Sequence, residues 1–128
     1  MTDSVNSREL VLAILLAVTK DGIYSHVAIS DVLTKYQYLE KQERSFITRV
    51  SEGTLERMLE LDYIINQFSS VKVNKMKPVI RCIIRSAVYE MKYMDSVPVS
   101  ASCNEAVKLA KKKGFGKLSG FVLSLIHI

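Results

Sequence analysis

The sequence predicts an all-helical bundle, and two observations lead to that prediction. Apolar residues recur at intervals of three and four along most of the 128-residue chain, rather than at intervals of two. The only prolines, Pro78 and Pro98, suit a helix start and a turn between helices. Because 48% of the residues are hydrophobic, a chain of this length can bury one core. We therefore expect one antiparallel bundle of about six to seven helices.

The first two predicted helices lie at the amino-terminal end. One helix runs from about Asn6 to Lys20, with Ser4 or Asn6 as its cap and Gly22 in the turn that ends it. A second helix covers about Ser25 to Lys35 and shows the same apolar spacing. We expect these two helices to pack against each other through a short connection.

The third predicted helix is long. It begins at Glu40 and continues to Leu61-Asp62, after which a shorter amphipathic piece extends to Phe68. Gly53 lies in its interior, where glycine costs about 1 kcal/mol relative to alanine. A close crossing by another helix at Gly53 would explain this glycine.

Three further helices are predicted in the carboxyl-terminal half. One runs from Pro78 to about Tyr93 and carries apolar residues on more than one face, so we expect it to lie centrally in the core. After a turn at Asp95–Pro98, another covers about Ser100 to Lys113. A last helix starts near Lys117 or Leu118 and is truncated by the end of the chain.

Positive charge is concentrated in the second half of the chain. Residues 1–67 carry 7 Lys or Arg against 10 Asp or Glu, whereas residues 68–128 carry 11 against 3. Since neutralisation of phosphates supplies most non-specific nucleic-acid affinity, this half is a candidate RNA surface. By charge alone, a solvated basic face is an equal alternative. The candidate RNA-binding residues are Arg8, Lys72, Lys75, Lys77, Arg81, Lys108, Lys111, Lys112, Lys113 and Lys117.

Arg81, Arg85 and Glu105 lie beside apolar positions on helices that should pack together. A buried arginine needs a partner, so we expect a structural ion pair between Arg85 and Glu105. For Arg81, a structural partner and a direct RNA contact are equally open.

The sequence contains no motif for catalysis, metal binding or cofactor binding. A phosphate loop needs GxxxxGK[ST] and a dinucleotide fold needs GxGxxG, and Gly114–Lys117 meets neither pattern. Cys82 and Cys103 lack CxxC spacing and neighbouring histidines, so we expect buried free thiols. No apolar run reaches the roughly 18 residues of a membrane span. We expect a cytoplasmic protein with no metal, no membrane association and no cofactor or catalytic site in this chain.

Several segments resemble the NusB-like family and follow one another in the family's order. They are Glu43–Phe46, Gly53, Leu61–Ile65, Ile84–Met91, Val97-Pro98 and Asn104–Lys111. The resemblance covers nearly the whole chain and implies an all-α domain that binds RNA. NusB-like domains occur as stand-alone antitermination factors, which bind RNA and a ribosomal-protein-like partner. They also occur as the leading domain of the small-subunit ribosomal RNA cytosine-5 methyltransferase B.

Four segments favour the methyltransferase subfamily. They are Asn6–Leu10, Gly22–Ser25, Leu61–Ser69 and Lys117–Val122. The resemblance then implies that residues 1–122 dock ribosomal RNA for a larger enzyme. The missing carboxyl-terminal domain would bind S-adenosylmethionine, supply the catalytic cysteine and be a second partner of this domain. Neither Cys82 nor Cys103 matches a catalytic motif of that enzyme.

The last six residues depart from the family's pattern. The family continues after Val122 with Asn, a small residue and Val-Leu-Arg, whereas this chain reads Leu-Ser-Leu-Ile-His-Ile. The codons CTG TCT CTT ATA CAC ATC encode that hexapeptide and look like a transposon end used to tag DNA for sequencing. We therefore expect residues 123–128 to be adapter read-through on an incomplete gene, with a genuine apolar helix end as the alternative.

Overall fold

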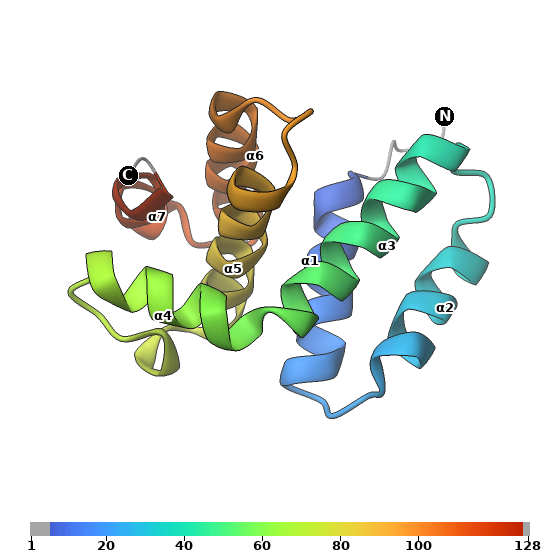
Figure 1. Ribbon diagram of the computed structural model, residues 1–128, viewed down its shortest axis with the longest axis horizontal. Helices are drawn as coiled ribbons and strands as arrows, with labels where there is room; N and C mark the ends of the chain where they lie inside the picture. Colours follow the sequence, from blue (N-terminus) through green and yellow to red (C-terminus); the bar gives the residue numbers. More distant parts are fainter. Residues whose placement is uncertain (1–5, 127–128) are drawn as a thin grey trace.

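The computed structural model describes residues 6–126, which form a bundle of α-helices with two short 3-10 helices (Figure 1). The α-helices are α1 (Ser7–Thr19), α2 (Ser25–Lys35), α3 (Lys41–Glu56), α4 (Met58–Phe68), α5 (Pro78–Tyr93), α6 (Val99–Lys112) and α7 (Ser119–Ile126). The 3-10 helices are η1 (Val73–Lys75) and η2 (Gly116–Leu118). No strand occurs in the described range, and the predicted all-α fold class is confirmed.

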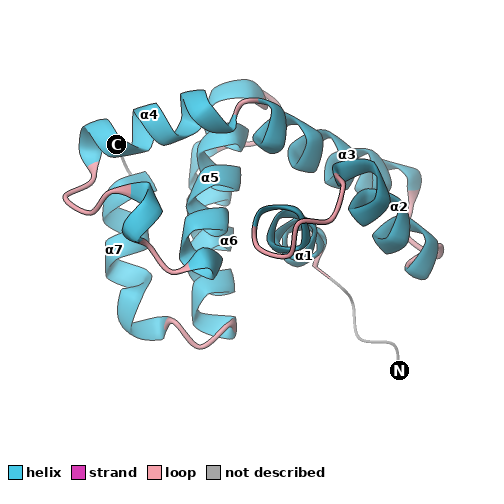
Figure 2. Cartoon of the chain, turned by 90° about the horizontal axis from the view of Figure 1, so that it is seen from below, coloured by secondary structure: helices cyan, strands magenta, loops and turns pink. Residues whose placement is uncertain are grey.

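Two groups of helices meet along α1 and α5. Helix α1 packs against α2 and α3 and also contacts α5, and in Figure 2 it is seen nearly end-on between these neighbours. Helices α5 and α6 lie side by side in opposite directions, and α7 packs against both of them. Because α5 and α6 are antiparallel, the first turn of α5 and the last turn of α6 lie at the same end of this hairpin.

The predicted cap and stop of α1 agree with the structure. The Asn6 side-chain oxygen accepts hydrogen bonds from the backbone N–H groups of Arg8 at 2.7 Å and Glu9 at 3.3 Å, which satisfies two donors of the first turn. Ser4, the alternative cap, lies outside the described residues. Gly22 and Gly114 have φ angles of 74° and 88°, so each chain reversal uses backbone geometry that glycine adopts without strain.

The predicted break between the third helix and the piece that follows it was wrong in position. The chain changes direction at Arg57, which ends α3 and precedes α4, rather than at Leu61-Asp62. Leu61 is fully buried inside α4. Leu55, Met58 and Leu61 keep a helical spacing through Arg57, so periodicity alone could not locate the change.

Gly53 marks the crossing of α3 and α5. A Cβ atom at this position would overlap the ring of Tyr89 on α5, so the predicted close crossing is confirmed. The predicted central place of α5 is confirmed as well, because its side chains are buried on several faces. The largest fully buried apolar side chains are Val11, Ile14, Leu15, Ile47, Val50, Leu61, Ile80, Ile83, Ile84 and Val122.

The carboxyl-terminal end of the described range is helical. Helix α7 runs to Ile126, so the segment 123–128 that we attribute to adapter read-through begins inside this helix. Residues 127 and 128 lie outside the described residues. Within residues 6–126, none of the helices combines the length and the hydropathy that a membrane crossing requires.

Candidate nucleic-acid interface

Eight exposed lysines of the second half gather towards one end of the α5–α6 hairpin. Three of them precede α5, three lie in the last turns of α6, one is the C-cap residue of α6 and one lies in η2. The antiparallel course of α5 and α6 brings these segments to the same end of the hairpin. We call this set the basic end: Lys72, Lys75, Lys77, Lys108, Lys111, Lys112, Lys113 and Lys117.

Two lysines of the basic end are paired with an acidic residue of α1. One carboxylate oxygen of Glu9 accepts a hydrogen bond from Lys112 Nζ and the other accepts one from Lys113 Nζ, both at 2.8 Å. These two hydrogen bonds are the main reason why the pKa of Glu9 is lowered. The carboxylate therefore stays ionised between its two cationic partners.

A small apolar pocket opens beside the basic end, between the segment before α5 and helix α7. Its volume is about 190 Å³. Its lining residues are Val71, Lys75, Met76, Lys77, Ile80 and Phe121. Phe121 is its aromatic wall. The sequence alone does not distinguish Phe121 as a binding residue, because an aromatic residue in an apolar helix has the pattern of a core residue.

Arg81 holds the segment that carries the first three lysines of the basic end. Its guanidinium donates hydrogen bonds to the backbone carbonyl oxygens of Val73 at 3.0 Å, Met76 at 2.9 Å and Asn74 at 3.4 Å. These carbonyls belong to η1 and the residues around it. Of the two roles that the sequence left open for Arg81, the geometry supports the structural one.

The prediction that Arg85 forms an ion pair with Glu105 is wrong. Arg85 donates two hydrogen bonds to Asp62 of α4, at 2.7 and 2.8 Å, and forms an interhelical ion pair there. Glu105 instead accepts from the Asn6 amide at 3.3 Å and from Lys108 Nζ at 3.5 Å. The physical reason is that α5 contacts α4 on the side that carries Arg85, whereas Glu105 lies where α6 meets the start of α1.

Arg8, another predicted RNA contact, is engaged inside the molecule. It donates to both carboxylate oxygens of Glu90, with contacts of 2.7 to 3.2 Å, and lies over the ring of Phe46. Glu90 is only 2% exposed and also accepts a hydrogen bond from Ser102 at 2.9 Å. The guanidinium therefore compensates a buried carboxylate and ties α1 to α5.

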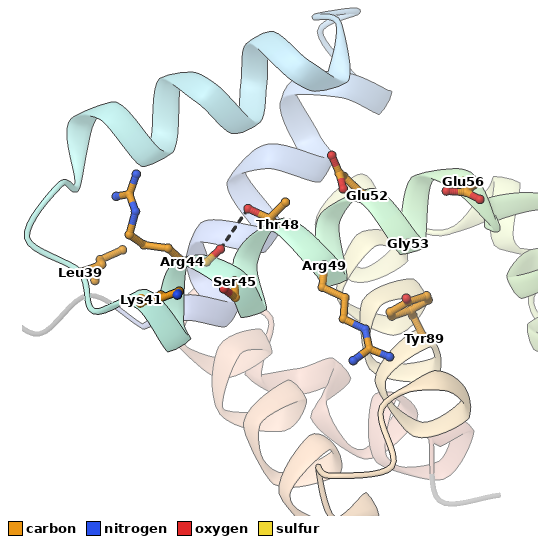
Figure 3. A pocket seen from close by; sticks show the side chains of 10 residues that line it. All are labelled: Leu39, Lys41, Arg44, Ser45, Thr48, Arg49, Glu52, Gly53, Glu56 and Tyr89. Atoms are coloured by element: carbon orange, nitrogen blue, oxygen red, sulfur yellow. Dashed lines mark hydrogen bonds between the residues drawn. The ribbon is translucent and has the colours of Figure 1, made fainter.

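A larger hollow of about 870 Å³ lies along the exposed face of α3 (Figure 3). Its two arginines already donate hydrogen bonds to backbone carbonyl oxygens. Arg44 donates to the carbonyl of Leu33 at 2.9 Å, and Arg49 donates to the carbonyl of Tyr93 at 3.0 Å. In Figure 3, Arg44, Arg49 and Glu52 point in different directions, so the charged groups do not converge on one point. A catalytic site needs such convergence, which this hollow lacks.

The two thiols have the environment of structural cysteines. Cys82 and Cys103 are 1% and 3% exposed, and burial raises the pKa of both. A reactive cysteine has a lowered pKa and an accessible sulfur, so these surroundings disfavour nucleophilic chemistry. Among the described residues, the structure brings no three His, Cys, Asp or Glu side chains together in a group that could hold a metal ion.

Comparison with known proteins places this helical arrangement in a family. The family model described as the NusB family matches residues 5–122 of the chain. A probable ribosomal RNA small subunit methyltransferase B of Synechocystis sp. is 33% identical over 123 residues, which are 96% of this chain and 27% of that protein. The transcription antitermination protein NusB of Bacillus subtilis is 33% identical over 117 residues, which are 91% of this chain and 86% of that protein.

A solved structure shows the same fold. A chain of a crystal structure of the antitermination factors NusB and NusE in complex with dsRNA superimposes with a TM-score of 0.86. The match covers 94% of this chain and 90% of that chain at 18% sequence identity. The chain therefore spans about a quarter of the methyltransferase relative, and most of the antitermination factor and of the solved chain.

Proposed function

Because the chain belongs to the NusB family, we propose that it is an RNA-binding domain whose basic end grips the phosphate backbone of ribosomal RNA. The observation that carries this proposal is the meeting of eight exposed lysines at one end of the α5–α6 hairpin. A structural neighbour that is described as a complex with dsRNA supports it. Lysines that contact phosphates fix register on the RNA but carry no sequence information.

The lysines differ in how free they are to reach a phosphate. Within the part of the chain that the structure describes, the ammonium groups of Lys111 and Lys117 have no hydrogen-bond or ion-pair partner. Lys112 and Lys113, in contrast, are held by Glu9. Removal of Lys111 and Lys117 therefore tests phosphate contact with little effect on the fold.

The apolar pocket supplies the second element of the proposed interface. Phe121 of α7 lines the pocket, and Lys75 and Lys77 line it from the segment before α5. Single-stranded nucleic acids bind where cationic groups follow the backbone and aromatic rings stack with bases. We propose that an unpaired base of the RNA stacks on Phe121 while Lys75 and Lys77 contact the phosphates beside it.

We further propose that the domain is the amino-terminal part of a small-subunit ribosomal RNA cytosine-5 methyltransferase. The four segments that resemble this subfamily support the proposal, and the catalytic domain with its S-adenosylmethionine would follow in the complete protein. No residue of this chain is proposed to hold that cofactor. The second candidate is a stand-alone antitermination factor, which the 86% coverage of the Bacillus subtilis relative favours.

The gene downstream of this coding sequence distinguishes the two candidates. A Rossmann-type S-adenosylmethionine fingerprint in the same reading frame is expected for the methyltransferase. A stop codon soon after the last helix would instead support the antitermination factor. Sequencing of the genomic locus gives the answer and also tests whether residues 123–128 are encoded there.

Filter binding to fragments of small-subunit ribosomal RNA over a salt series tests RNA binding itself. We expect the logarithm of affinity to fall linearly with the logarithm of salt concentration. The double substitution Lys111→Gln and Lys117→Gln should lower the slope by about 1.4, since each contact to a single strand contributes about 0.7. The matched control, Lys20→Gln with Lys41→Gln, removes the same charge from the first half and should leave the slope unchanged.

Two results would overturn the proposed interface. One is an affinity that does not change with salt. The other is an unchanged affinity when Lys111, Lys112 and Lys113 are all replaced by glutamate. Thermal unfolding of each variant must accompany the binding curves, because the charge reversal at Lys112 and Lys113 faces Glu9.

A further inference from the structure

We propose that the Glu9 carboxylate competes with the RNA backbone for Lys112 and Lys113. The carboxylate pairs with both lysines until RNA phosphates displace it. This inference rests on the proposed function of the basic end. It assigns to Glu9 a role in setting affinity: RNA must replace a carboxylate to use these two lysines. An RNA that makes further contacts can do so, whereas a polyanion held by charge alone is disfavoured.

The geometry of the contact supports competition. Each oxygen of Glu9 accepts a hydrogen bond from one ammonium group, at 2.8 Å in both cases, so the two lysines share a single anion. Carboxylate and phosphate oxygens are the same kind of acceptor for an ammonium donor. A phosphate that approaches Lys112 or Lys113 therefore meets a site that Glu9 already fills.

The lysines remain accessible to RNA despite this pairing. The side chains of Lys112 and Lys113 are 60% and 36% exposed, against 21% for Glu9. Ion pairs at this degree of exposure are individually weak, so a phosphate can replace the carboxylate. The contact is thus reversible, and it differs from the buried pair of Arg8 with Glu90.

Glu9 is fixed beside the basic end by its neighbours in the first turn of α1. Arg8 is bound to Glu90 of α5, and the Asn6 amide donates to Glu105 of α6. These contacts hold the backbone of α1 against the hairpin on either side of Glu9. The carboxylate therefore stays within reach of Lys112 and Lys113 after RNA has bound, and the competition persists.

The test measures binding of a labelled oligouridylate of about 20 nucleotides by fluorescence anisotropy, with wild-type chain and Glu9→Gln. Removal of two exposed ion pairs to the same carboxylate should tighten binding about three- to tenfold at low salt. The gain in affinity should shrink as salt is raised, because screening weakens both the ion pairs of Glu9 and the contacts between lysines and phosphates. Glu52→Gln is the matched control, since it makes the same change in net charge on the exposed face of α3.

A second set of variants tests whether Glu9 acts through Lys112 and Lys113. In a chain with Lys112→Gln and Lys113→Gln, the substitution Glu9→Gln should leave the affinity unchanged, because its targets are gone. Glu9→Asp keeps the charge and the acidic residue in the first turn but shortens the side chain, so its affinity should lie between those of wild type and Glu9→Gln. This variant keeps the test valid if Glu9→Gln folds poorly.

The outcomes separate this inference from the proposed function. If the wild-type chain binds in a salt-sensitive way but Glu9→Gln binds no tighter than Glu52→Gln, Glu9 is no competitor and the RNA interface still stands. Weaker binding by Glu9→Gln would show that Glu9 positions the lysines, which also overturns the inference. Wild-type binding that is absent or independent of salt overturns the proposed function and this inference with it.

Discussion

Arg85 of α5 and Asp62 of α4 are joined by two hydrogen bonds of 2.7 and 2.8 Å, in a pair that lies mostly inside the molecule. Arg85 is 8% exposed, and the side chain of Asp62 is 24% exposed. A guanidinium in such surroundings needs an anionic partner, because an unpaired buried charge is strongly destabilising. The pair therefore fixes α4 against the central helix of the bundle.

Replacement of Asp62 by alanine should lower the free energy of unfolding by about 2–4 kcal/mol, because Arg85 would be left buried without its partner. Urea denaturation followed by circular dichroism measures this change. Glu105→Ala is the control, since Glu105 is the partner that sequence alone suggested. Its exposed contacts to Lys108 and to the Asn6 amide should together be worth less than about 1 kcal/mol. A larger loss for Glu105→Ala than for Asp62→Ala would contradict the assignment.

Gly53→Ala should destabilise the chain by about 1–3 kcal/mol, although alanine is the better helix former by about 1 kcal/mol. The reason is the overlap of a new Cβ with the ring of Tyr89. The combination with Tyr89→Leu, which removes the ring, should recover part of the loss relative to Tyr89→Leu alone. Thermal unfolding of the four proteins gives this coupling, and strict additivity would argue against the close crossing.

Glu60 should make stability depend on pH in acidic solution. Hydrogen bonds from Lys92, Tyr93 and Arg57 lower the pKa of Glu60 from 4.5 to about 2, with Lys92 as the largest cause. A lowered pKa in the folded state means that the unfolded chain binds the proton more tightly. The contribution of Glu60 is therefore fully present above about pH 4.5 and is lost as the pH falls to about 2.

The measurement compares melting temperatures of wild type and Glu60→Gln between these two pH values. The difference should be largest at the upper end and should shrink towards the lower end. Glu56→Gln removes an equal charge from the end of α3 and controls for the change in net charge. A difference between wild type and Glu60→Gln that is constant over the whole range would refute the assignment.

The parts of the fold that sequence predicted well are those with local chemical signals. Pro78 defines the start of α5, and both ends of α2 also agree with the predicted range. The break at Arg57 has no such signal, because the apolar spacing runs through it. Pattern alone therefore merged the first turn of α4 with α3.

The candidate site also contains residues that the sequence predicted and contacts that it did not. The lysines of the basic end were predictable, because charge is counted directly along the chain. The contact between Glu9 and Lys112 joins residues 103 positions apart, and no periodicity relates them. The partner of Arg85 was missed for a related reason: helical phase shows which face a side chain occupies, but not which neighbouring helix covers that face.

The apolar pocket beside the basic end leads to a prediction that separates stacking from phosphate contact. Phe121→Leu keeps an apolar wall but removes the ring, so affinity for single-stranded RNA should fall by about 1–2 kcal/mol while the salt slope stays unchanged. Lys75→Gln should instead lower the slope by about 0.7. Phe68→Leu is the control, because Phe68 is 57% exposed at the end of α4 and does not line the pocket.

Filter binding of an unstructured oligonucleotide over a salt series measures the affinity and the slope together. Stacking involves no counterion release, whereas each lysine–phosphate contact releases counterions in proportion to the charge that it neutralises. The two substitutions must therefore change different parameters of the same curve. If Phe121→Leu lowers the slope, or if Phe68→Leu weakens binding as much as Phe121→Leu does, the pocket is not where a base stacks.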